Sequence, residues 1–118
     1  MGDGVQMRWR WFFYAAAAYN IIIGGAGLAN SAAAVNDRIV GLLVLCFGLV
    51  YAIVGRDPAR FGPVLWAGIA GKAGIVALLL PDVLAGSAAP GTGAILSGDA
   101  LFTIGFLIFL LRRSATPA

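Results

Sequence analysis

The chain has 118 residues, of which 61% are hydrophobic and 11% are charged, and its formal net charge is +3. Soluble domains carry about 25% charged residues, so this composition excludes an ordinary soluble domain and indicates a membrane protein. There is no histidine, no glutamate and a single cysteine, Cys46. The chain therefore lacks histidine as the commonest general base and the commonest metal ligand, and one cysteine cannot complete a thiolate metal site. We expect no metal, no cofactor and no enzymatic activity.

Four apolar runs follow one another, at about residues 11–29, 39–54, 61–80 and 94–111. A helix needs ~20 apolar residues to cross a bilayer, and the first and third runs are close to that length. The second run is short, and Ser97, Gly98 and Asp99 interrupt the fourth. Turn-forming residues fill the connections, including a Pro- and Gly-rich stretch at 81–93. Since no connection can hold a further domain, we predict an all-α membrane protein with one domain over residues 1–118, a bundle of four transmembrane helices.

The start of the chain also has features of a secretory signal. Arg8 and Arg10 precede an apolar run that ends in small residues, as a cleavable signal would. The run is longer than the 7–15 residues of a typical signal core. We therefore expect it to stay in the protein as the first span, with cleavage as the alternative.

Basic residues are distributed unequally between the connections. The segments before the first run, between the second and third, and after the fourth hold six arginines: Arg8, Arg10, Arg56, Arg60, Arg112 and Arg113. The remaining connections hold only Arg38. Cytoplasmic segments are rich in Lys and Arg, so this bias predicts cytoplasmic termini in a bacterial inner membrane. Dispersal of the arginines around apolar runs also argues against a nucleic-acid partner.

Tryptophans are expected where a membrane meets water. Trp9 and Trp11 lie at the cytoplasmic end of the first run, as this rule predicts. Trp66 fits less well, because it lies about one turn inside the third run.

Three polar residues reach a similar depth when residues are counted from the cytoplasmic ends of the runs. At ~1.5 Å per residue, Asn20 lies ~15 Å in, Lys72 ~16 Å and Asp99 ~18 Å. An ammonium inside a membrane is expensive and normally faces other helices and pairs. We therefore predict a polar site near the midplane in which Lys72 pairs with Asp99, with Asn20 completing the hydrogen bonding. Two alternatives remain open: a purely structural pair, and a Lys72 side chain that extends unpaired toward the outer interface.

Small residues surround Lys72 in the third run. Gly68, Gly71 and Gly74, together with neighbouring alanines, make small-xxx-small pairs that allow helices to approach closely. We predict a helix-packing face here, either within the chain or between copies.

Aromatic residues follow Asp99 with helical spacing. Phe102, Thr103 and Phe106 lie on the same face of the fourth run as Asp99, and Tyr19 lies beside Asn20. Such residues are typical of a cavity for a quinone, a lipid or a small amphiphile, although ordinary packing explains them as well.

Several short segments carry a resemblance to known proteins: Tyr19-Asn20, Gly48–Tyr51 leading to Arg56–Pro58, Gly68–Lys72 and Gly98–Phe102. They are similar to segments of small, uncharacterised four-helix membrane proteins of bacteria, and in outline the chain resembles DoxX-like proteins. The resemblance implies a four-helix membrane fold and, without a catalytic motif, no activity. Small multidrug-resistance transporters match the chain in size, but they depend on a membrane-embedded glutamate that this chain lacks.

These features predict a small integral membrane protein that acts as a non-enzymatic subunit or binding module. Its expected partners are the lipid bilayer and either another copy of the chain or a larger membrane protein. One alternative is a small transporter or channel for a proton, an anion or an amphiphilic solute. Another is a quinone- or lipid-handling subunit of a membrane oxidoreductase.

Overall fold

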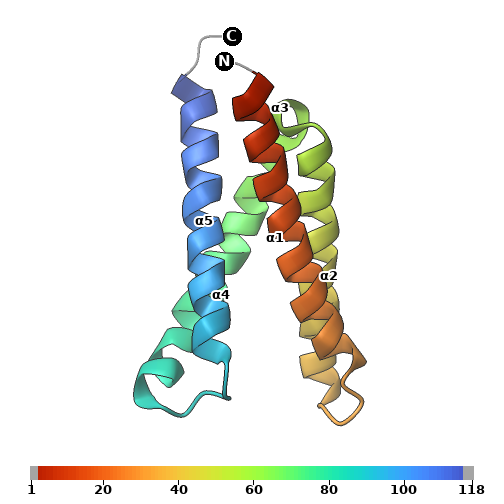
Figure 1. Ribbon diagram of the computed structural model, residues 1–118. Helices are drawn as coiled ribbons and strands as arrows, with labels where there is room; N and C mark the ends of the chain where they lie inside the picture. The colour runs from red at the N-terminus through yellow and green to blue at the C-terminus, as the bar shows by residue number, and fades with distance from the viewer. Residues whose placement is uncertain (1–2, 116–118) are drawn as a thin grey trace. The chain divides into compact units, whose positions relative to one another are not determined.

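The computed structural model describes residues 3–115, with side chains described for residues 7–113. In this range the elements are α1 (Asp3–Ala29), α2 (Val35–Arg56), α3 (Pro58–Phe61), the 3₁₀ turn η1 (Gly62–Val64), α4 (Leu65–Ala85) and α5 (Thr92–Ala115) (Figure 1). Four segments are long and apolar enough to cross a membrane: Met7–Ala29, Val35–Arg56, Pro58–Ala85 and Thr92–Arg113. The predicted all-α class and the four apolar helices of a multi-pass membrane protein are confirmed.

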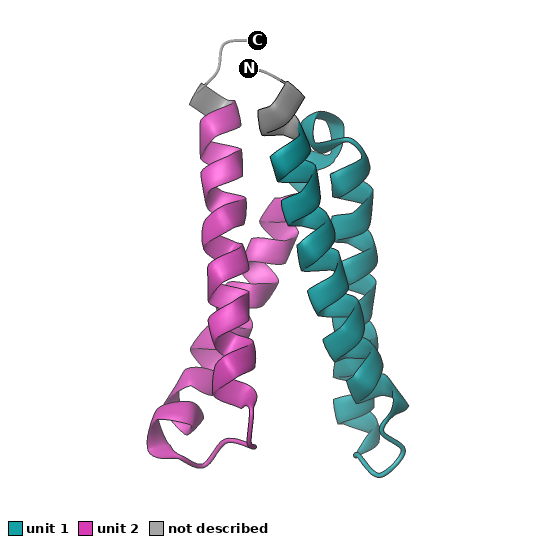
Figure 2. Ribbon diagram, in the orientation of Figure 1, with its two compact units in different colours: residues 1–64 teal, residues 65–118 magenta. Residues whose placement is uncertain are grey.

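The helices form two compact units, residues 1–64 and residues 65–118 (Figure 2). Unit 1 contains α1, α2, α3 and η1, and unit 2 contains α4 and α5. Each unit is thus built around one pair of long helices joined by a short connection. A single domain of four bundled helices stays a prediction.

In unit 1, α1 and α2 are antiparallel and their backbones touch where glycines face each other. A Cβ atom added to Gly24 would lie 2.4 Å from the backbone N of Leu45 and 2.6 Å from the backbone O of Gly41. A Cβ atom added to Gly41 would lie 2.6 Å from the backbone N of Leu28. Only glycine fits at these positions, because backbone atoms of a neighbouring helix cannot move aside as a flexible side chain does.

In unit 1, one arginine near the start of each long helix caps the last turn of the other long helix. Arg10 Nε in α1 donates to the backbone O of Gly55, 3.0 Å away in the last turn of α2. Arg38 Nε in α2 donates to the backbone O of Leu28, 2.9 Å away in the last turn of α1. The last carbonyls of a helix have no partner within it and carry partial negative charge, so a guanidinium satisfies both needs.

Between α2 and α4 the chain does not run as one straight helix. Asp57 Oδ1 accepts a hydrogen bond from Arg60 N at 3.3 Å, which caps the short helix α3. The 3₁₀ turn containing Pro63 follows, and α4 starts at Leu65. The predicted third span, 61–80, lies within the apolar segment Pro58–Ala85, which consists of α3, η1 and α4. Trp66 is the second residue of α4, so it lies at the start of this helix and not one turn inside it.

The end of α4 differs from the sequence-based prediction, which placed a connection at 81–93. Pro81 lies inside α4, and the helix continues to Ala85. Gly86 then adopts a φ of 76°, its N–H donates to Val83 O at 3.2 Å, and Ser87 N donates to Asp82 O at 2.9 Å. This is a Schellman motif, in which a left-handed glycine ends the helix.

The helix α5 is continuous through Ser97, Gly98 and Asp99, which the sequence suggested as an interruption. The Ser97 hydroxyl donates to Gly93 O, 2.9 Å away and one turn earlier. Serine is compatible with a helix interior when its hydroxyl bonds back in this way.

Candidate functional site

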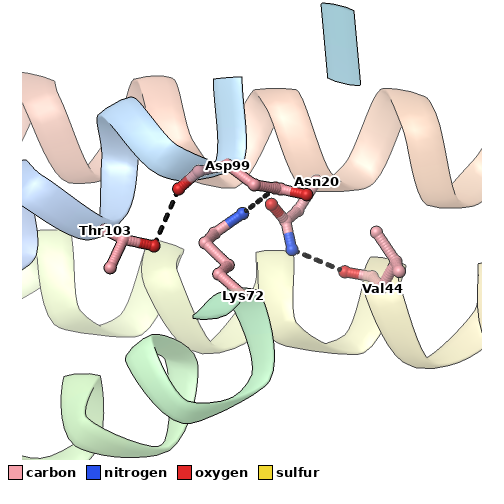
Figure 3. A network of polar contacts seen from close by, with 5 residues as sticks. All are labelled: Asn20, Val44, Lys72, Asp99 and Thr103. Carbon is pink, nitrogen blue, oxygen red and sulfur yellow. Dashed lines mark hydrogen bonds and ion pairs between the residues drawn. The ribbon is translucent and has the colours of Figure 1, made fainter. Parts of the chain in front are cut away.

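An ion pair joins the two helices of unit 2. Lys72 Nζ in α4 lies 2.6 Å from Asp99 Oδ1 in α5, and the two side chains are 6% and 10% exposed (Figure 3). The contact that the depth count predicts is therefore present, within a hairpin in which both helices are apolar enough to span a membrane.

This geometry contradicts the alternative of an unpaired Lys72 that reaches for the outer interface. The ammonium is buried and bonded to a carboxylate at a distance typical of a strong, charge-assisted hydrogen bond.

Aromatic rings adjoin the pair from α5. Lys72 Nζ lies 5.7 Å from the centre of the Phe102 ring, a distance at which the negative ring face attracts a cation. The Phe102 and Phe106 ring centres are 6.3 Å apart, and Phe106 is fully buried. Phe102 thus provides the ammonium with a second electrostatic contact besides Asp99, and Phe106 continues the aromatic face along α5.

Thr103 is on α5 one turn after Asp99, and its hydroxyl is committed to its own helix. Thr103 Oγ1 donates to the backbone O of Asp99 at 2.7 Å (Figure 3). A hydroxyl has one proton, so while this bond lasts Thr103 offers a ligand only an acceptor. Its polar role is therefore to fix the backbone beside Asp99.

Asn20 is buried in unit 1, where it links α1 to α2. Its Nδ2 donates to the backbone O of Val44 at 3.1 Å (Figure 3). The predicted convergence of Asn20 with Lys72 and Asp99 stays a prediction. Tyr19 is half-buried on α1, and the cavity predicted from Tyr19 and the α5 residues also stays a prediction.

Two of the three glycines in the predicted packing face of α4 make no close contact in the described chain. Gly68 is buried, but a Cβ atom added to Gly71 or Gly74 meets no atom within 4 Å in the described chain. Contact between copies at these glycines stays a prediction. The close backbone contact lies at Gly24 and Gly41 in unit 1 instead.

Sequence reasoning missed the reciprocal arginine caps. An available signal was the position of Arg10 and Arg38 near the start of each helix of a tight hairpin, where each lies opposite the last turn of the other. The charge count treated both only as markers of topology.

Among the described residues, no group of three or more His, Cys, Asp or Glu side chains is placed to hold a metal ion. Comparisons of the chain with protein-family models, curated proteins and solved structures find no match. The resemblance to DoxX-like proteins is neither supported nor contradicted by these comparisons.

Proposed function

We propose that the chain is a small protein of the bacterial inner membrane that acts as a non-enzymatic subunit or binding module, with Lys72 and Asp99 as its polar centre. The observation that carries the proposal is the buried ion pair of unit 2. Replacing a buried ion pair by apolar residues is often neutral or stabilising by about 1–4 kcal/mol. Since two apolar side chains would join the helices at least as well, stability alone explains the pair poorly.

A charged ligand would bind at this pair by replacing one of its two members as the partner of the other. An acidic or phosphate group from a lipid or a neighbouring helix would compete with Asp99 for the ammonium of Lys72, and a basic group would compete for the carboxylate. Either exchange keeps both charges paired, which a buried site requires. The Phe102 ring helps to hold the ammonium during such an exchange.

The proposal is tested by removing both charges together. The tagged chain, expressed at its native level and extracted from host membranes in mild detergent, is expected to migrate as an assembly larger than itself. The Lys72→Met/Asp99→Asn double variant should lose this assembly while remaining folded, with a cooperative melting transition in detergent. The matched control is Ser97→Ala, because Ser97 lies on the same helix but bonds to its own backbone.

Two results would contradict the proposal. If the double variant is stable and still assembles, the pair is only structural. If the purified chain moves protons across proteoliposome membranes and the double variant does not, the protein is a transporter rather than a binding module.

We also propose that both termini face the cytoplasm. The support is the excess of arginines at the ends of four spans, six against one. The one exception, Arg38, bonds to the carbonyl of Leu28, so a structural requirement accounts for its place.

A further inference from the structure

One end of unit 1 gathers positive charge from three elements. The start of α1 carries Arg8 and Arg10, the last turn of α2 carries Arg56, and α3 carries Arg60. The hydrogen bond from Arg10 Nε to Gly55 O joins the start of α1 to the end of α2 at 3.0 Å. Figure 1 shows α3 at this same end of the α1–α2 pair.

The charge at this end is exposed and mostly uncompensated. Arg8, Arg56 and Arg60 are exposed, and we call these three residues the arginine patch. Within residues 3–14 and 51–64 the sequence has four arginines and two acids, Asp3 and Asp57, which leaves a net charge of +2. Asp57 accepts the backbone N–H of Arg60, so its carboxylate also serves as a helix cap.

Trp11 lies close to this end of unit 1 and is exposed. Its side chain is 66% exposed and lies about one helical turn further along α1 than Arg8. Exposed indoles favour the boundary between hydrocarbon and headgroups. With Trp11 at that boundary, the arginine patch lies at the level of the lipid phosphates.

We propose that the arginine patch binds the phosphate groups of anionic phospholipids. A planar guanidinium matches a phosphate in two parallel hydrogen bonds, and basic residues beside a membrane are attracted to anionic headgroups. The site is independent of the Lys72–Asp99 pair, and it would give unit 1 a preference for one class of lipid.

The test measures lipid affinity of the purified full chain in detergent by native mass spectrometry. Phosphatidylglycerol should bind at least about tenfold more tightly than phosphatidylcholine, and added salt should weaken this preference. The Arg8→Gln/Arg56→Gln variant should lose about 25-fold in affinity for phosphatidylglycerol, at about fivefold per arginine, with phosphatidylcholine unaffected. The matched control, Arg112→Gln/Arg113→Gln, removes the same charge from unit 2. It should lose less affinity than the patch variant, because Arg113 already contacts the Phe109 ring, whose centre is 5.9 Å away.

A melting curve in detergent verifies that each variant is folded. The proposal is wrong if the two lipids bind equally to the wild-type chain. It is also wrong if the two double variants lose affinity equally, which would reflect net charge alone, or if the patch variant binds phosphatidylglycerol as the wild type does.

Discussion

The guanidinium of Arg38 donates a hydrogen bond to a backbone carbonyl of the neighbouring helix. It is half-buried and bonds to the backbone of Leu28, where α1 ends. Arg10 makes the equivalent bond to Gly55 at the other end of the hairpin. Arg38 therefore has a structural role at the end of α1, where its guanidinium satisfies a carbonyl that has no partner within the helix.

Replacing Arg38 with glutamine should destabilise the protein by about 1 kcal/mol, because the Leu28 carbonyl loses a charged donor at a partly exposed site. Arg8→Gln removes the same charge from an exposed position at a helix start and should leave stability unchanged or slightly improved. Unfolding of both variants in detergent with added denaturant gives the comparison. Equal stabilities would mean that the Arg38 bond contributes nothing.

The pairing of Lys72 with Asp99 could be predicted from sequence, because a charged side chain within an apolar run normally faces other helices and pairs with an opposite charge. Its surroundings could not. The contact with Phe102 and the bond from Thr103 to the Asp99 carbonyl depend on side-chain rotamers, which residue spacing does not determine.

At the scale of the elements, glycine has different roles in the two units. In unit 1, Gly24 and Gly41 allow α1 and α2 to touch through their backbones. In unit 2, a Cβ atom added to Gly71 or Gly74 would meet no atom within 4 Å in the described chain. The small-xxx-small pattern is present around Lys72, yet the pattern alone does not reveal which glycines face a neighbouring helix.

Gly24→Ala should destabilise unit 1 by about 1–3 kcal/mol, because its Cβ would overlap backbone atoms of Leu45 and Gly41. Gly25→Ala is the matched control, since its Cβ would lie 3.8 Å from the end of the Leu45 side chain, an ordinary contact. The control should be neutral or gain up to about 1 kcal/mol in helix propensity. Thermal or denaturant unfolding separates the two, and a Gly24→Ala variant as stable as Gly25→Ala would refute the close contact.

Helix ends were harder to predict than helices. Pro81 looks like a stop, but a proline removes one hydrogen bond and the apolar residues after it continue α4 to Ala85. Gly86 ends the helix because glycine adopts the left-handed conformation without steric cost. At the other end, Pro63 and the capped turn at Asp57 shift the start of α4 from residue 61 to residue 65.

For the whole molecule, hydropathy was sufficient to predict four helices long enough to cross a membrane, in the observed order. Apolar residues such as Leu78 and Leu84 are 80% and 78% exposed, as lipid-facing residues are expected to be. Each pair of consecutive helices forms its own unit, an arrangement that average hydropathy does not reveal.

The proposed orientation predicts which engineered cysteines react in intact cells. In a Cys46→Ser background, needed because Cys46 is exposed, a cysteine at Ser87 should react with an impermeant maleimide and one at Ser114 should not. Both should react after the cells are opened. Reaction at position 114 alone would reverse the orientation, and equal reaction at both in intact cells would indicate dual insertion or a different number of spans.

The most direct test of the account is a double-mutant cycle on Lys72 and Asp99, with the free energy of unfolding of the whole chain as the readout. Lys72→Met strands the Asp99 carboxylate and Asp99→Asn strands the Lys72 ammonium, so each should cost about 3–5 kcal/mol. The double variant leaves no unpaired charge and should cost less than either alone. This strong non-additivity is expected because the two side chains bond to each other at 2.6 Å. Losses that simply add would contradict it, since they would show that Lys72 and Asp99 act independently.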